Sequence, residues 1–438
     1  MASLQQMLDA RERRALRQQN MLTHCRTVVS LTFVAPGEEK SGPLYDRLFD
    51  EALPLVRSSL SSFGPVLREE QTRSITGSEA LFGLDADATA VKKLCVTLEE
   101  DHPCGRCFDI DVLDREGKKS RTTPRRCLLC EKSAHDCSRS RAHPIEDVKE
   151  AIARLALRPL AQEWADKLAS LACESLIFEL LAHPKPGLVT PLDTGSHSDM
   201  DAFSFGSSIA ALTPHFRRIA LWGWQTAFCP RPQFEALRPL GLEAEKAMLD
   251  ATSGVNTHKG AIFCLGLALA AAAALACRGL TLTAQALGKE VQSLLGDQLS
   301  SPNADSHGAT VFRSHGLTGA RGEALSGFQR AQDQLPLYCS HQEGHNERLV
   351  LTLLNLCSTL EDTNMVYRGG IEKAKEAKER SKQTFQSLLK GSSTAAAELE
   401  ALCDFYKKGR LSPGGAADLL ALTHFLSRIN SIQSEETK

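Results

Sequence analysis

Apolar and polar residues follow two different patterns along this chain, and the change lies near residue 155. In the first part the run Val28–Val34, rich in β-branched and aromatic residues, predicts a strand. After Ala161 apolar residues recur at helical spacing, and glycine-rich polar loops separate the helices. We therefore expect an α+β domain over residues 1–155 and a larger all-α domain over residues 156–438. Further helical patterns in the first part lie at residues 8–21, 43–60 and 88–100.

A second strand pattern, between Gly105 and Leu113, carries two carboxylates. Alternation along a strand places Asp109 and Asp111 on one face and the apolar residues on the other. Such a pair can hold a divalent cation, here Mg²⁺ on a polyphosphate leaving group. The guanidinium of Arg106, just before the strand, can bind phosphate. The alternative is that the same pattern marks a solvated edge strand.

A cysteine-rich segment follows this strand. Cys127 and Cys130 have the standard spacing of a zinc ligand pair, and Cys137 and His143 come soon after them. The set predicts a Cys₃His zinc site, and the alternative is a group of reduced thiols in a small basic subdomain. The arginines around the segment would also suit an acidic partner surface.

In the second part, the uncharged stretch Ala261–Cys277 is long enough to raise the question of a membrane span. Alanine dominates it, and it falls short of the roughly 20 strongly apolar residues that a span needs. We expect a buried helix and no membrane association.

The loop that opens this helix carries an amide, a hydroxyl, an imidazole and an ammonium group, on Asn256, Thr257, His258 and Lys259. Backbone N–H groups at a helix start attract anions, and a lysine adds a full positive charge. The loop therefore favours a phosphate site. A helix with Thr257 at its N-cap and a solvated lysine would account for the same residues.

Further loops of the second part also place charged groups beside glycines. Ordinary turns need glycine and asparagine, but they do not need lysine, histidine, arginine and aspartate repeatedly. Cations for phosphate, acids for metal and glycines for close backbone approach together indicate a polyphosphate site. These loops cover residues 183–187, 195–201, 316–323, 361–364 with 368–370, and 411–418.

Composition narrows the class of protein. The formal net charge is −2 over 438 residues, which argues against a general nucleic-acid binder because such proteins carry a large basic excess. Fourteen cysteines without a recognisable signal peptide favour a reducing compartment, so we expect a cytoplasmic protein.

Three runs in the first part are distinctive: Gly-Arg-Cys-Phe-Asp-Ile-Asp-Val-Leu, Arg-Arg-Cys-Leu-Leu-Cys and Cys-Ser-Arg-Ser-Arg-Ala-His. With these runs the first part resembles the holo-acyl-carrier synthases of citrate lyase, over residues 5–150. That family attaches a phosphoribosyl-dephospho-coenzyme-A group to a serine of the lyase acyl carrier protein and releases pyrophosphate. The resemblance implies that Asp109 and Asp111 hold Mg²⁺ on the departing pyrophosphate while Arg106 steadies it.

The second part contains Pro-Lys-Pro-Gly-Leu-Val, Gly-Val-Asn-Thr-His-Lys-Gly, Leu-Thr-Gly-Ala-Arg-Gly-Glu, Asp-Thr-Asn with Arg-Gly-Gly, and Leu-Ser-Pro-Gly-Gly. It is similar to the triphosphoribosyl-dephospho-coenzyme-A synthases over residues 165–430. That family joins ATP to 3′-dephospho-coenzyme A and releases adenine. Its product is the substrate of the first reaction, so the resemblance implies a bifunctional transferase.

For this second reaction we expect a nearby carboxylate or histidine to take the proton from the attacking 2′-hydroxyl. His197 or His258 could do so, and the sequence does not choose between them. Mg²⁺ on the triphosphate would be held by carboxylates from Asp199, Glu323 and Asp362. The candidate phosphate-binding residues are Lys185, Asn256, Thr257, Lys259, Arg321, Asn364 and Arg368.

Two alternatives to a bifunctional transferase stay open on the sequence alone. In one, the protein is a single-activity synthase, and its cysteine-rich first part is a zinc-dependent module that only docks the acyl carrier protein. In the other, the second part is a nonenzymatic helical scaffold whose polar loops serve as helix caps.

Overall fold

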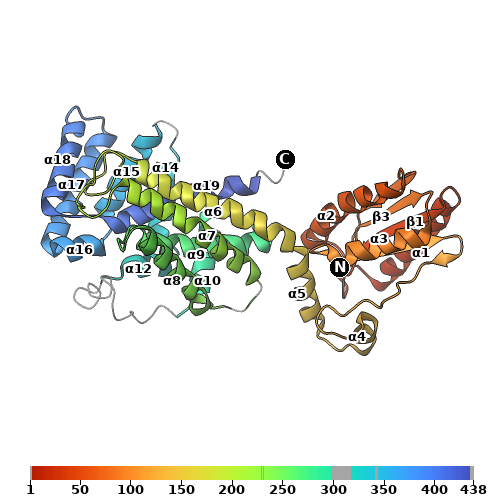
Figure 1. Ribbon diagram of the computed structural model, residues 1–438. Helices are drawn as coiled ribbons and strands as arrows, with labels where there is room; N and C mark the ends of the chain where they lie inside the picture. The colour runs from red at the N-terminus through yellow and green to blue at the C-terminus, as the bar shows by residue number, and fades with distance from the viewer. Residues whose placement is uncertain (1, 228, 230, 298–316, 341–343, 435–438) are drawn as a thin grey trace. The chain divides into compact units, whose positions relative to one another are not determined.

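The computed structural model describes residues 2–227, 229, 231–297, 317–340 and 344–434. It divides into two compact units, Met1–Leu160 and Ala161–Lys438 (Figure 1). The division follows Leu160, whereas the sequence pattern predicts a boundary between residues 155 and 156. One unit contains a β-sheet with helices, and the described part of the other is helical, as the sequence predicts.

The first unit is built on a five-stranded antiparallel sheet with the strand order β2-β3-β1-β4-β5. Strand β1, the predicted Val28–Val34 run, lies between β3 and β4, with Ser30 opposite Asp111 and Thr32 opposite Asp109. The strands are β1 (Thr27–Phe33), β2 (Arg68–Thr72), β3 (Glu79–Leu84), β4 (Phe108–Asp114) and β5 (Gly117–Lys118).

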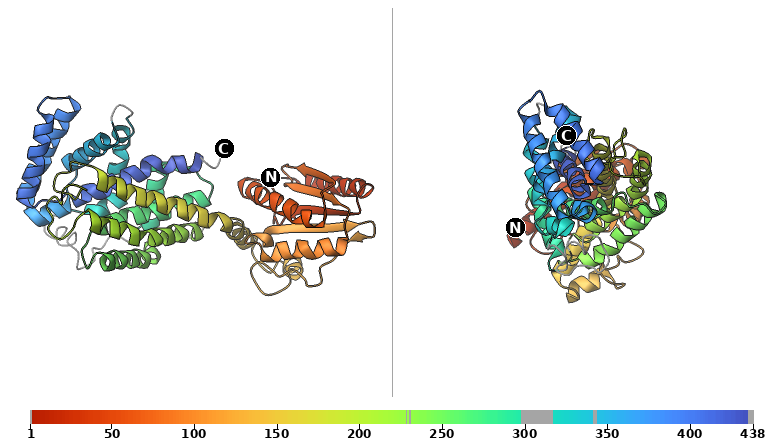
Figure 2. Two further views of the ribbon diagram at one scale, coloured as in Figure 1. Left: turned by 45° about the horizontal axis from the view of Figure 1, so that its top comes forward. Right: turned by 90° about the vertical axis from the view of Figure 1, so that its left-hand side faces the viewer.

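Helices cover both faces of this sheet (Figure 1, Figure 2). On one face Met21 of α1 packs against Val28 and Leu81, which share that face with Asp109 and Asp111. On the other face Phe33 and Phe108 pack with Phe49 of α2. The helices of this unit are α1 (Leu4–Leu22), α2 (Pro43–Leu60), α3 (Ala88–Asp101), α4 (Ala134–Ser140) and α5 (Ile145–Ala156).

The second unit has no strand among its described residues. Its longer helices are α6 (Arg158–Leu181), α7 (Ala202–Gln225), α8 (Phe234–Ala251), α9 (Lys259–Cys277), α10 (Ala284–Leu295), α15 (His345–Thr359), α17 (Ile371–Leu389), α18 (Ala395–Gly409) and α19 (Gly414–Ser434). Shorter helices are α12 (Gly319–Leu325), α13 (Gln329–Asp333), α14 (Leu335–Tyr338) and α16 (Thr363–Gly369).

Helix α9 forms the centre of this unit. It packs against α7, α8, α10, α12 and α19, and sixteen of its nineteen residues are buried. Among the described helices it alone is long and apolar enough to cross a membrane, but 89% of its most apolar window is buried inside the protein. The predicted buried helix is therefore confirmed. Contact with α7 is so close that a Cβ at Gly223 would overlap the backbone of Ala270.

Candidate functional site

A cavity of about 1220 Å³ lies in the helical unit, and nearly all of the predicted polar loops reach it. Its wall includes residues from the loop before α7 and the first residues of α9, α12, α16 and α19. Segments far apart in the sequence thus meet around one space. Nine predicted site residues line it: His197, Asp199, Asn256, Thr257, His258, Lys259, Arg321, Asn364 and Arg368. Gly316, in the loop that leads to Arg321, lies outside the described residues.

The start of α9 differs from the capped helix that was the alternative to a phosphate loop. His258 occupies the N-cap position, and its own side chain does not cap the helix. Asn256 Oδ1 accepts a hydrogen bond from the backbone N–H of Lys259 at 3.1 Å, whereas Thr257 Oγ1 is buried without a partner in the described part of the chain. Lys259 Nζ lies 2.9 Å from Glu245 on α8, at the cavity wall. Thr257 is therefore not the N-cap, whereas Lys259 is exposed, as the alternative of a solvated lysine expects.

His258 is almost fully buried between the cavity and the protein core. Its Nδ1 lies 2.7 Å from Ser208 Oγ, and its ring contacts Phe205 edge to face. Burial, reinforced by the ammonium of Lys185, lowers the pKa of His258 to about 3, so the imidazole is neutral at physiological pH. Its Nε2 has no hydrogen-bond partner among the described residues.

His197, the other candidate base, has both ring nitrogens engaged. Nε2 lies 2.9 Å from Ser412 Oγ, and Nδ1 lies 3.3 Å from a guanidinium nitrogen of Arg368. Because a guanidinium can only donate, Nδ1 is the acceptor in this contact. Burial first, and then the charge of Arg368, lower the pKa of His197, while Asp199 at 3.7 Å opposes them.

Lys185 does not line the cavity, although its loop was predicted to bind phosphate. Its side chain is fully buried, and Nζ donates to the carbonyl oxygen of Glu179 at 2.6 Å and to Glu179 Oε1 at 2.5 Å. Glu179 does line the cavity. The ammonium of Lys185 thus compensates a carboxylate at the wall.

Asp418 is a functional candidate that sequence reasoning missed. It lies in the N-terminal half of α19, lines the cavity and is partly buried. Burial, together with the charges of Asp362 and Glu179, raises its pKa well above the usual range. A Cβ at Gly260 would overlap the Asp418 carboxylate, so only glycine allows this approach. The signal was present, since Asp418 ends the conspicuous Gly-Gly-Ala-Ala-Asp run.

The three predicted Mg²⁺ ligands lie in different places. Asp199 lines the large cavity, whereas Glu323 and Asp362 line a smaller adjoining one that shares Asp418 with it. The Asp362 carboxylate caps α16 and also accepts from the backbone N–H of Ala416 at 3.1 Å. Within the described ranges, the only group of three or more potential ligands that converges is the Cys/His set of the first unit. The three predicted carboxylates therefore do not converge on one metal site among the described residues.

In the first unit Asp109 and Asp111 lie on one face of β4, as predicted, while Phe108, Ile110 and Val112 are buried on the other face. Asp111 forms an ion pair with Lys118 at 2.7 Å, and a guanidinium nitrogen of Arg125 lies 3.9 Å from Asp109.

Two further arginines lie near this strand. Arg14 of α1 faces the two aspartates: their charges raise its pKa against the larger effect of burial, which lowers it. Arg106 precedes β4 in a 3₁₀ turn and donates to the carbonyl oxygen of Cys127 at 2.6 Å. The predicted phosphate-binding arginine is thus engaged with the cysteine-rich segment.

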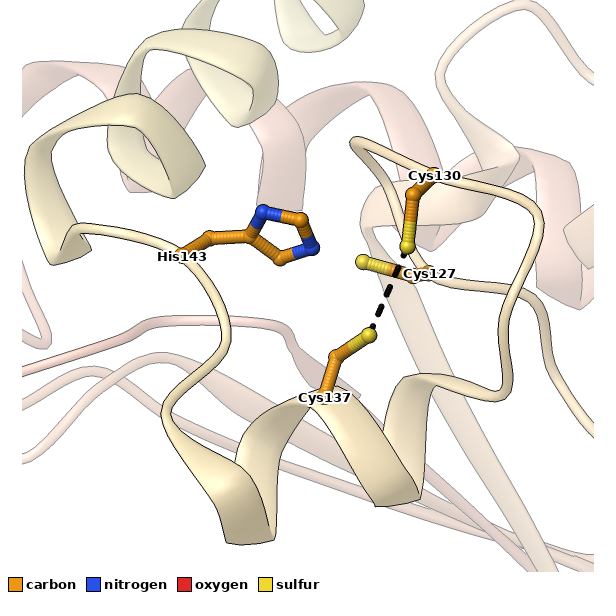
Figure 3. Close-up of side chains that lie close together, drawn as sticks. All are labelled: Cys127, Cys130, Cys137 and His143. Carbon is orange, nitrogen blue, oxygen red and sulfur yellow. Dashed lines mark hydrogen bonds between the residues drawn. The ribbon is translucent and has the colours of Figure 1, made fainter.

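That segment brings Cys127, Cys130, Cys137 and His143 together (Figure 3). Their ligand atoms all lie within 4.8 Å of one another. The sulfur atoms of Cys130 and Cys137 are 3.5 Å apart, and His143 Nε2 is buried without a hydrogen-bond partner among the described residues.

Comparisons with known proteins separate the same two parts. Residues 2–158 match the family CitX, apo-citrate lyase phosphoribosyl-dephospho-CoA transferase, and residues 165–437 match CitG, ATP:dephospho-CoA triphosphoribosyl transferase. The chain is 35% identical to Protein CitXG of Haemophilus influenzae, over 97% of this chain and 95% of that protein. With Protein CitXG of Leuconostoc mesenteroides subsp. cremoris the identity is 31%, over 98% of this chain and 97% of the relative.

A single-activity relative is also similar. The chain is 38% identical to the 2-(5''-triphosphoribosyl)-3'-dephosphocoenzyme-A synthase of Klebsiella pneumoniae, over 62% of this chain and 92% of that protein.

The buried neutral His258 predicts a pH-dependent stability. Its folded pKa of about 3 lies below its ordinary value of 6.5, so the unfolded chain binds the proton first. The stabilisation is complete above pH 6.5 and is lost as the pH falls toward 3. Between pH 6.5 and 5 the free energy of unfolding of the wild type should fall by about 2 kcal/mol more than that of His258→Gln.

Urea unfolding followed by tryptophan fluorescence measures this difference. All three tryptophans, Trp164, Trp222 and Trp224, lie in the helical unit, so the signal reports that unit in the full-length protein. Equal pH dependence of the two proteins would show that His258 is not buried as a neutral group.

Proposed function

Because the chain belongs to the CitXG family and carries two transferase domains, we propose that it makes and then attaches the prosthetic group of citrate lyase. The helical unit joins ATP to 3′-dephospho-coenzyme A and releases adenine. The first unit transfers the resulting phosphoribosyl-dephospho-coenzyme-A group to a serine of the citrate lyase acyl carrier protein and releases pyrophosphate. Since both matched families are transferases, a nonenzymatic scaffold is set aside.

The observation that supports the first step most directly is the gathering of helix starts around one cavity. The first residues of α9 and α19, helices of 19 and 21 residues, both line it. Helix N-termini carry partial positive charge, which favours anions. Some of the first N–H groups are already bonded within the protein, that of Lys259 to Asn256 and that of Ala416 to Asp362. Lys259, Arg321 and Arg368 add full positive charges at the wall. The triphosphate of ATP is the part of the substrates that such a wall would hold.

The cavity wall also has an apolar part, which includes Phe205, Phe234 and Phe263. Aromatic rings provide flat apolar surface for a nucleobase and for the uncharged stretch of a coenzyme-A arm. The wall thus combines the two kinds of surface that a nucleotide and dephospho-coenzyme A require.

In the reaction, the 2′-oxygen of dephospho-coenzyme A forms a bond to the anomeric carbon of the ATP ribose, and the bond from that carbon to adenine breaks. The hydroxyl proton must leave the attacking oxygen. We assign this proton to Nε2 of His258, because that nitrogen has no partner among the described residues, whereas both nitrogens of His197 are engaged. His197 and Arg368 would instead orient the phosphates.

The carboxylates of the helical unit are also suited to Mg²⁺ that arrives bound to the nucleotide. Mg²⁺ keeps several waters and is usually held by one or two carboxylates plus substrate phosphates, so no preassembled cage is needed. Asp362 is buried and Asp418 is partly buried, and desolvation raises the pKa of each. A cation near them would relieve this unfavourable burial of charge. The metal would supply charge neutralisation on the phosphates.

For the second step, Asp109 and Asp111 offer two carboxylates on one face of β4, again suited to Mg²⁺ carried by a polyphosphate. The carrier serine oxygen forms a bond to the phosphorus next to the ribose, and the bond from that phosphorus to pyrophosphate breaks. Arg125 lies 3.9 Å from Asp109, and Arg14, which forms an ion pair with Glu79, is near enough for both aspartates to raise its pKa. Both guanidinium groups can bind the phosphate oxygens.

The assigned roles predict different kinetic defects in adenine release. Lys259→Ala should raise the KM for ATP about 10-fold to 100-fold, because a charge-assisted contact to phosphate is lost. His258→Gln should lower kcat about 100-fold or more with a smaller change in KM, because the proton acceptor is lost.

Lys246→Ala is the matched control, since Lys246 is an exposed lysine of α8 outside the cavity wall. Adenine released from ATP and dephospho-coenzyme A is quantified by chromatography. If Lys259→Ala behaves like Lys246→Ala, Lys259 does not bind the substrate phosphates.

The two reactions should also separate by mutation. The double variant Asp109→Asn, Asp111→Asn should lose at least about 99% of carrier labelling, because electrostatic stabilisation of the departing pyrophosphate is removed. Adenine release by the same protein should be unchanged. Glu116→Gln, at an exposed turn after β4, serves as the control.

Persisting transfer in the double variant would refute the role of the aspartates. A wild-type protein that releases adenine but never labels the carrier would support the single-activity alternative with a docking module.

A further inference from the structure

We propose that the first unit binds one structural Zn²⁺ through Cys127, Cys130, Cys137 and His143, and that this ion holds the segment between β5 and α5 in its fold. The proposal is independent of the two reactions described above. It rests on the local backbone, on the geometry of the four ligand atoms and on the scarcity of other core residues in the segment.

The backbone folds so that the four side chains point to one spot (Figure 3). A β-bridge between Arg126 and Ser133, with a hydrogen bond from Cys127 N to Lys132 O at 2.7 Å, closes a tight turn that carries Cys127 and Cys130. The backbone N–H of Leu129 points to the sulfur of Cys127 at 3.5 Å. Such a turn presents both thiols on its inner side.

The other two ligands come from the next stretch of chain. Cys137 lies on α4, which ends at Arg141 in the left-handed conformation with φ 50°. The backbone N–H of Ala142 bonds to the carbonyl oxygen of Cys137 at 3.0 Å, and the chain turns back so that His143 faces the thiols. One turn, one helix and one return loop thus contribute to the same site.

The distances suit a tetrahedral zinc ion. Zinc–sulfur bonds of about 2.3 Å place the ligand atoms of a tetrahedron about 3.8 Å apart. The ligand atoms here lie within 4.8 Å of one another, and the sulfur atoms of Cys130 and Cys137 are 3.5 Å apart. Three thiolates and one imidazole in tetrahedral array are the ligands that select zinc.

His143 provides an independent sign of a missing partner. Its Nε2 is buried and has no hydrogen bond among the described residues. A buried polar atom without a partner is costly, and native structures seldom leave one unpaired. This nitrogen belongs to the converging ligand set, so a bound metal would satisfy it.

The segment cannot be held by an apolar core of its own. All residues from Val112 to Ile152 are described, and between these two the only buried apolar residues are Cys127 and Cys137. A disulfide does not replace the missing core, because Cys127, Cys130 and Cys137 form none. Small folds with too little core are commonly stabilised by a metal. Four protein ligands leave no open position, which makes the site structural rather than catalytic.

The site is joined to the start of β4, the strand that carries Asp109. Arg106 donates to the carbonyl oxygen of Cys127, and Arg125 donates to that of Phe108. Arg125 also forms an ion pair with the buried Glu99 at 3.2 Å. Ordering of this segment by zinc would therefore keep the Arg125 guanidinium beside Asp109.

Metal analysis of the full-length protein, purified without chelators and freed of any affinity tag, tests the proposal. We expect about one zinc per chain. Cys130→Ser should lose the bound zinc, while Cys339→Ser, which removes an exposed thiol of the helical unit, should retain it. Zinc-free wild type, or full zinc retention in Cys130→Ser, would overturn the proposal.

A second variant guards against simple misfolding of Cys130→Ser. His143→Cys keeps four ligands and should still bind metal. After cobalt substitution its visible bands should be shifted from those of the wild type, because a thiolate replaces the imidazole. Identical cobalt spectra of the two proteins would mean that His143 is not a ligand and would overturn the assigned set.

Carrier labelling and adenine release, measured on the same samples, separate this proposal from the proposed function. We expect Cys130→Ser to lose carrier labelling and to keep adenine release. A wild type that contains zinc but does not label the carrier would contradict the transfer reaction while leaving the metal site intact.

Discussion

Helix α9 carries an almost unbroken apolar surface, and the need to enclose it on all sides arranges the helical unit. Alanine and glycine at most of its positions let neighbouring helices approach closely, as the contact between Gly223 and Ala270 shows. Of the helices that pack against it, α12 and α19 have their first residues at the cavity where α9 begins. The N-terminus of this apolar helix therefore faces a cavity with polar walls, because α12 and α19 begin at the same place.

The charges of this cavity are divided between its wall and the protein beneath it. Lys259 and Arg368 are at the wall, where they can reach a ligand. Lys185 lies below, fully buried and paired with Glu179. Asp362, which is buried, and Asp418, which is partly buried, have raised pKa values because desolvation outweighs the backbone N–H groups that they accept from. Carboxylates with raised pKa values are common at functional sites.

Several features of the fold could be predicted from the sequence, and the reason is clear for each of them. The burial of α9 follows from composition alone, and the alternation in β4 correctly placed Asp109 and Asp111 on one face. Strand β3 was missed because its sequence, Glu-Ala-Leu-Phe-Gly-Leu, has no β-branched residue and is buried throughout, so neither propensity nor alternation marks it. Sequence patterns record local preferences, and this strand owes its state to its two neighbours.

The roles of individual charged residues were harder to predict from the sequence. A lysine beside glycines looks the same whether it binds a ligand or a buried carboxylate, and only the fold distinguishes Lys185 from Lys259. Asp418 was not singled out within its loop, since nothing local reveals its contact with Gly260. Thr257 is a suitable N-cap by type, but the chain places His258 at that position.

We propose that the separate helix starts form one nucleotide site. Hydrogen–deuterium exchange of the full-length protein, with and without ATP and Mg²⁺, is the direct test of this proposal. We expect ATP and Mg²⁺ to slow exchange simultaneously in peptides covering residues 256–262, 318–321, 363–368 and 412–418. Exchange in the sheet of the first unit should not change. Protection of only one of these segments, or of none of them, would contradict it.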